Sequence, residues 1–146
     1  MDTSDFLILS IISLVGWVVV GVRLMGLCNA SGVSSGWMSF IPVLNLTRWA
    51  RLAGANPWLV AIWLIPLIGW LIGVVLSFVW LNKVSEATGT KSPWFIVYVV
   101  AFLASIVQGG VIHGVIGWLI AVVLTLGSIY SLWMIFDPTK PIAAKA

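Results

Sequence analysis

The chain has 146 residues, of which 62% are hydrophobic and only 8% are charged. Soluble domains contain about 45–50% apolar and about 25% charged residues, so this composition cannot cover a water-soluble surface. It excludes a soluble enzyme, a nucleic-acid-binding module and a disordered linker. The sequence therefore predicts an integral membrane protein that has membrane lipids as partners and binds no nucleic acid.

The few ionisable residues narrow the chemistry further. Seven Lys and Arg against four Asp and Glu give a net charge of +3. The basic residues lie between apolar runs, where such residues meet lipid phosphates and set topology. Cys28 and His113 are the single members of their types, which excludes an intrachain disulfide and a zinc site built from Cys and His. We predict no metal site.

The first apolar run, from Phe6 to Val22, contains no charge and no proline. Asp2 and Asp5 precede it, whereas a secretory signal peptide begins with positive charge. We therefore expect a retained membrane span over residues 6–27.

The next segment mixes Trp and Leu with polar side chains. Asn45, Arg48 and Arg51 recur at i, i+3 and i+6, which places them on one stripe of a helix. This pattern predicts an interfacial amphipathic helix over residues 38–53, with Pro42 in its first turn. We expect its Trp-rich face in lipid and its polar stripe toward the headgroups.

A second span is predicted over residues 58–81. Trp58 and Trp80 are separated by about 33 Å on a continuous helix, which matches the two aromatic belts of a bilayer. Pro66 removes a hydrogen bond within this helix and predicts a kink. Three small residues form a ridge suited to helix packing: Gly69, Gly73 and Ser77.

The run from Pro93 to Phe136 carries no charge and would form a single helix about 66 Å long, twice the thickness of a bilayer. We expect it to reverse in its glycine-rich part, from Gln108 to Gly117. This predicts spans over residues 93–108 and 115–136. A second ridge of small residues follows the reversal: Gly117, Ala121 and Thr125.

The predicted fold is an all-α integral membrane bundle of four transmembrane helices plus one interfacial amphipathic helix, in a single domain over residues 1–146. Four spans place the three arginines on one membrane face and the four lysines on the other. This near-equal division does not determine orientation by the positive-inside rule. The acidic N-terminus favours both termini outside, with the arginine loop cytoplasmic.

A short pattern is repeated in the chain. Ile41-Pro42-Val43-Leu44-Asn45 and Ile65-Pro66-Leu67-Ile68-Gly69 share Ile-Pro-x-x followed by a small or polar residue. With Trp37, Ala53-Gly54 and Trp58 in their places, residues 23–90 resemble a family of small, uncharacterised bacterial multi-span membrane proteins. The resemblance implies a multi-pass protein of the bacterial plasma (inner) membrane and no defined activity.

Two groups of residues are candidate binding sites. Asn45, Arg48, Arg51 and Gln108 are candidates for binding an anionic lipid headgroup, or else form a solvated stripe. His113 is a candidate axial ligand for a haem or chlorophyll-type ring, or else a turn histidine in the headgroup zone. We otherwise expect no cofactor.

Catalytic residues are not evident. The predicted spans contain no Asp, Glu or Lys, and no motif supports a nucleophile near His113. We therefore predict that the chain is not an enzyme. The leading expectation is an accessory or assembly subunit packed against other membrane-protein subunits. The alternatives are a binder or carrier of lipids or other hydrophobic small molecules, and a pigment-binding subunit that uses His113.

Overall fold

The computed structural model describes residues 3–111 and 114–143, and gives only the backbone of residues 70, 91, 92, 106–111, 114 and 115. Every regular element in these residues is helical, which confirms the all-α prediction. In chain order they are α1 (Thr3–Ala30), η1 (Gly36–Phe40), α2 (Leu44–Leu52), η2 (Pro57–Leu64), α3 (Ile68–Ala87), η3 (Lys91–Phe95), α4 (Ile96–Val111) and α5 (Gly114–Ile135). Here η1 and η2 are 3₁₀-helices, and η3 is one turn of π-helix.

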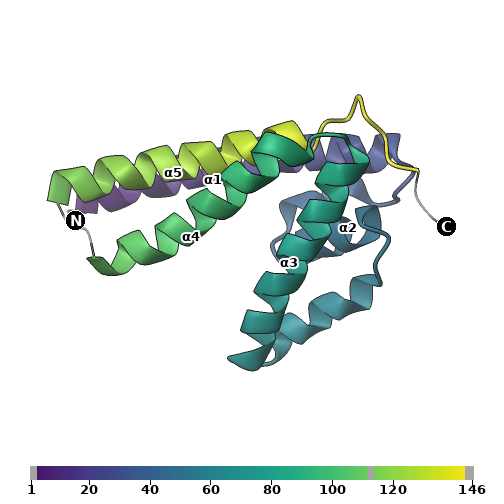
Figure 1. The fold of residues 1–146 in the computed structure, drawn as a ribbon, viewed down its shortest axis with the longest axis horizontal. Helices are drawn as coiled ribbons and strands as arrows, with labels where there is room; N and C mark the ends of the chain where they lie inside the picture. The colour runs from purple at the N-terminus through teal and green to yellow at the C-terminus, as the bar shows by residue number, and fades with distance from the viewer. Residues whose placement is uncertain (1–2, 112–113, 144–146) are drawn as a thin grey trace.

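Three long helices run along the longest axis of the molecule (Figure 1). α1 and α5 lie side by side and point in the same direction, whereas α4 runs back along α5. The apolar segment 93–136 is thus divided between two helices that pack together. The elements between α1 and α4, namely η1, α2, η2 and α3, gather around the end at which α1 and α5 finish (Figure 1).

Two helices in the searched part of the structure are long and apolar enough to cross a membrane. They are Thr3–Ala30, with mean hydropathy 2.3, and Ile116–Ile135, with mean hydropathy 1.9. Only 17% and 11% of their most apolar windows are buried inside the protein. Pro93–Ser105 is apolar but shorter. Two of the four expected spans are therefore helices long and apolar enough to cross a membrane.

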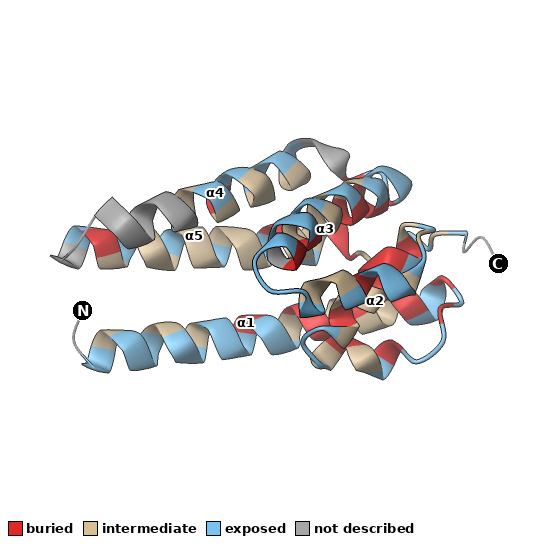
Figure 2. Cartoon of the chain, turned by 90° about the horizontal axis from the view of Figure 1, so that it is seen from below, coloured by how far each residue is buried: buried red, intermediate tan, exposed pale blue. Residues whose placement is uncertain are grey.

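The buried core lies at one end of the molecule. It combines the C-terminal parts of α1, α3 and α5 with α2, and Leu24, Trp80 and Phe136 are among its largest side chains. Figure 2 shows buried residues concentrated around α2 and α3, whereas the N-terminal half of α1 is largely exposed. Apolar side chains such as Phe6 and Ile11 remain uncovered there, which is typical of a lipid-facing helix.

The repeated Ile-Pro sequence forms the same turn twice. Each copy follows a 3₁₀-helix and precedes an α-helix, so η1–α2 and η2–α3 are two versions of one unit. Ile41 and Ile65 are both extended, with ψ of 124° and 116°. The steric clash with a following proline disfavours the helical region, so each proline ends the helix before it.

The expected continuous second span, residues 58–81, is wrong. The chain breaks at Ile65–Leu67, and η2 folds back along α3 (Figure 1). Leu67 has φ 60°, and the N–H of Ile68 donates to the carbonyl of Pro66 over 2.7 Å, which closes a tight γ-turn. Trp58 and Trp80 therefore do not mark the two ends of one helix.

The expected interfacial helix over residues 38–53 is also too long. Only Leu44–Leu52 is α-helical, and Pro42 lies before this helix rather than in its first turn. Its tryptophan does not face lipid: Trp49 is buried, and its ring lies 5.4 Å from that of Phe136. Tertiary contacts of α2 with η1, η2, α3 and Phe136 override the local amphipathic pattern.

The small residues of α3 receive the returning 3₁₀-helix. A Cβ atom at Gly69 would clash with the carbonyl oxygen of Ile62, and one at Gly73 would clash with the indole of Trp63. This ridge therefore packs inside the chain. The third member, Ser77, donates its hydroxyl to the carbonyl of Gly73 over 2.9 Å.

Two glycine substitutions should have opposite effects on the free energy of unfolding. Gly73→Ala should destabilise the protein by about 1–3 kcal/mol, because the new methyl group overpacks the contact with Trp63. Gly127→Ala should stabilise it by about 0.5–1 kcal/mol, because Gly127 is helical and a Cβ there meets nothing within 4 Å. Unfolding of both variants in detergent micelles provides the measurement. Equal stability would contradict the packing of η2 on α3.

Arg23 fixes the parallel pair α1 and α5 at its buried end. Its Nε donates to the carbonyl of Trp133 over 3.3 Å, and its guanidinium carbon lies 4.2 Å from the centroid of the Trp133 ring. The same side chain lies 3.8 Å from the carboxylate of Asp137. Hydrogen bonds from the backbone and hydroxyl of Thr139 are the main reason that the pKa of Asp137 is lowered. A cation at the C-terminus of α5 also complements the helix dipole.

Candidate functional site

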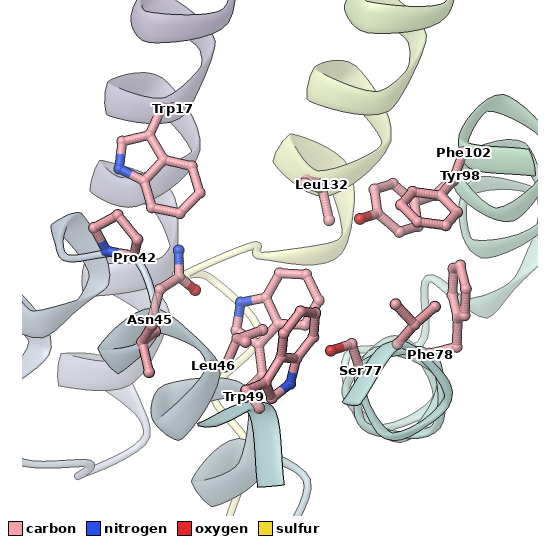
Figure 3. Close-up of a pocket in the computed structure, with 13 residues that line it drawn as sticks. Trp17, Pro42, Asn45, Leu46, Trp49, Ser77, Phe78, Tyr98, Phe102 and Leu132 are labelled. Carbon is pink, nitrogen blue, oxygen red and sulfur yellow. The ribbon is translucent and has the colours of Figure 1, made fainter. Parts of the chain in front are cut away.

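A cavity of about 440 Å³ lies where the helices meet (Figure 3). This volume is within the range of sites for small molecules. Side chains from α1, α2, η2, α3, α4 and α5 contribute to its wall. The lining residues are Trp17, Pro42, Val43, Asn45, Leu46, Trp49, Trp63, Val74, Ser77, Phe78, Tyr98, Phe102 and Leu132.

The wall is mostly aromatic and aliphatic. On the α3–α4 side, the rings of Phe78 and Phe102 meet edge to face at 5.1 Å, and Tyr98 stacks beside Phe102. Trp17, Pro42 and Val43 form an exposed rim, and the indole N–H of Trp17 donates to the carbonyl of Phe40 over 3.1 Å. The cavity is therefore an apolar space with one side toward the surface.

Three buried polar atoms of the lining residues have no hydrogen-bond partner in the chain, namely Asn45 Oδ1, Trp49 Nε1 and Trp63 Nε1, and the first two belong to α2. Asn45 is 4% exposed and Trp49 is 7% exposed, yet the amide Oδ1 of the first and the indole Nε1 of the second make no hydrogen bond. They occupy positions i and i+4 of α2 and thus share one face of that helix. Figure 3 shows the amide of Asn45, the hydroxyl of Ser77 and the phenol of Tyr98 directed toward the cavity.

A second cavity, of about 270 Å³, continues the first along the long helices. The two share six lining residues: Trp17, Asn45, Trp49, Tyr98, Phe102 and Leu132. The second extends between α1 and α5 past Gly16 and Thr125 to Leu124. Together they form a groove that begins at the buried end of the molecule and runs toward the middle of the long helices.

Arg48 does not face this groove. It is 4% exposed, and its Nε and Nη2 donate to the hydroxyl of Thr47 and the sulfur of Met38 over 3.2 and 3.3 Å. Its Nη1 donates to the carbonyl of Ser34. All three acceptors are neutral. Burial lowers the pKa of Arg48, and the positive charge of Arg51 lowers it further.

The expected polar stripe is therefore separated into three environments. Asn45 lines the apolar cavity and Arg48 is buried against the loop before η1, whereas Arg51 is exposed. Arg51 lies beside Lys83 in a different, more polar recess. The helix is so short and so closely covered that its polar residues meet different neighbours instead of one headgroup surface.

The sequence groups Gln108 with Asn45, Arg48 and Arg51 as a candidate for binding a lipid headgroup. The side chain of Gln108 lies outside the described residues, but its backbone is near the end of α4 that points away from α2 (Figure 1). The break at Pro66 explains the difference: residues 57–87 leave and return to the same end, so α4 starts beside the arginines and runs away from them.

The remaining candidates lie along α4 and α5. His113 lies outside the described residues, so its possible role as a haem or chlorophyll-type ligand stays a prediction. In the second small-residue ridge Gly117 is buried, Ala121 is half-buried, and Thr125 lines the groove between α1 and α5. No group of three or more potential metal ligands occurs among the described residues.

Sequence reasoning missed most of the cavity. The sequence patterns predict a lipid-facing surface for Trp49 and a packing ridge for Ser77. Tyr98 falls within the predicted span over residues 93–108 and is not singled out. The detectable signal was polar atoms within apolar helices, because a buried indole, amide or hydroxyl usually has a partner. Which of them point into one space depends on contacts between distant segments.

Comparisons of the chain with models of protein families, with curated protein sequences and with solved structures found no match in any of the three. The resemblance of residues 23–90 to a bacterial membrane-protein family therefore stays a prediction.

Proposed function

We propose that this chain is an integral membrane protein of the bacterial inner membrane that binds a lipid or another hydrophobic small molecule in the groove beside α2. The observation that carries the proposal is the cavity of about 440 Å³, whose lining is almost entirely apolar. Such a space within a membrane is filled by an apolar chain or ring, because an empty cavity loses packing contacts.

In the proposed arrangement α1, α4 and α5 cross the bilayer. The paired η2 and α3 lie obliquely to these helices, and they start from the α2 end and return to it (Figure 1). The tip of this pair is apolar and exposed at Leu64, Leu67 and Ile68, which supports its burial in hydrocarbon. This arrangement has three crossings rather than the expected four, because the break at Pro66 turns one span back.

Charge supports one orientation of this arrangement. All six described Lys and Arg residues lie at the end of the molecule that holds α2: Arg23, Arg48, Arg51, Lys83, Lys91 and Lys140. Asp5 lies near the start of α1, at the opposite end. Because basic residues are retained in the cytoplasm, we assign the α2 end to the cytoplasm and the N-terminus to the outside.

Filling the cavity should remove its occupant. Ser77 points into the space, so Ser77→Phe should abolish the hydrophobic molecules that remain with the purified protein (Figure 3). Val15→Phe is the control and should retain them, because it adds a ring at an exposed position of α1 that lines neither cavity. Native mass spectrometry, followed by solvent extraction, measures both. Equal retention by the two variants would overturn the proposed function.

An accessory or assembly role within a larger membrane complex stays a prediction. The uncovered apolar side chains of α1, such as Leu14 and Val18, are compatible with a partner helix as well as with lipid. The packing ridge of α3 offers less support, because Trp63 of the same chain already covers Gly73.

A further inference from the structure

The unpartnered polar atoms of α2 indicate the chemistry of the occupant. Asn45 Oδ1 is a hydrogen-bond acceptor and Trp49 Nε1 is a donor, and both are buried without a partner. Leaving such groups unsatisfied is costly, typically about 1–3 kcal/mol each. A single hydroxyl group can satisfy both, because its oxygen accepts from the indole while its proton is donated to the amide oxygen.

Charge in the ligand is disfavoured. None of the described residues that line either cavity is charged. The nearest buried cation, Arg48, directs its N–H groups to Ser34, Met38 and Thr47, away from the groove. An anionic headgroup placed between Asn45 and Trp49 would thus lose its hydration without gaining a counter-charge.

The groove also has the direction that an amphiphile needs. Asn45 and Trp49 lie at the cytoplasmic end proposed above, and the second cavity leads from them along α5. From Leu132 to Leu124 this path is about 12 Å long, at the rise of an α-helix. A polar head at α2 would therefore direct an apolar chain toward the middle of the bilayer.

Resting on the proposed function, we infer that the ligand is a neutral, single-chain amphiphile with a hydroxyl head that binds between Asn45 and Trp49. The class includes long-chain alcohols and monoacylglycerols. The hydroxyl head, rather than a phosphate or carboxylate, is the recognised feature.

Three probes of equal chain length separate the possibilities: oleyl alcohol, oleyl methyl ether and oleate. The full-length protein in detergent micelles is titrated with each, and bound probe is counted by native mass spectrometry. The alcohol should bind about five- to tenfold more tightly than the ether, because the ether cannot donate to Asn45. Equal binding of alcohol and ether, or tighter binding of oleate, would overturn the inference while the proposed function stands. Binding of none of the three would overturn both.

Two variants test whether Asn45 is the residue that recognises the hydroxyl group of the ligand. Asn45→Leu should remove the preference for the alcohol over the ether. Tyr98→Phe deletes a hydroxyl from the opposite wall without changing its shape, and should retain the preference (Figure 3). If Asn45→Leu does not fold, the preference of the unmodified protein and of Tyr98→Phe still provides the test. Loss of the preference in Tyr98→Phe would overturn the assignment to Asn45.

Discussion

Trp49→Ala should cost about 3–5 kcal/mol of unfolding free energy, the range for removing a large aromatic side chain from a core. Trp49 is 7% exposed, and its ring lies 5.4 Å from that of Phe136. This ring pair joins α2 to the residue that follows α5. Its loss should leave a void where α1, α2 and α5 meet.

Trp58→Ala is the matched control, because Trp58 is 82% exposed. Substitutions at exposed positions usually change stability by less than about 0.5 kcal/mol. Unfolding of both variants by titration with sodium dodecyl sulfate, from the same mild detergent, gives the comparison. A similar small loss in both would mean that α2 is not part of the core.

The second large effect concerns the membrane orientation of the two termini. Ser4→Cys and Thr139→Cys place single reactive thiols at opposite ends of the molecule, where both positions are exposed. In spheroplasts, a membrane-impermeant maleimide should label the first variant fully. It should label the second only after lysis, because the positive end is retained in the cytoplasm.

The natural cysteine provides the control for this experiment. Cys28 is fully buried, so the parent chain should remain unlabelled before and after lysis. An arrangement of four spans would place both termini on one side, and the two variants would then be labelled together. Labelling of Thr139→Cys alone in spheroplasts would invert the proposed orientation.

The Ile-Pro repeat shows which features of the fold the sequence predicts and which it does not. The sequence shows the repeat, but it predicts different roles for its two prolines: Pro42 in the first turn of a helix and Pro66 at a kink. A missing hydrogen bond alone does not distinguish a kink from a reversal. Reversal at Pro66 depends on the fit of Trp63 against Gly73, a contact that the proline itself does not encode.

Composition and local spacing were sufficient to predict helices, long apolar segments and the division of residues 93–136 between two helices, but not the breaks at Pro42 and Pro66. These properties follow from backbone sterics and from the transfer of side chains between water and oil, which act over a few neighbouring residues. The location of the basic residues at one end and the convergence of Asn45, Trp49 and Tyr98 on one cavity came only with the folded chain. Both result from packing between segments tens of residues apart. The sequence pattern of one helix does not identify the segment that packs against it.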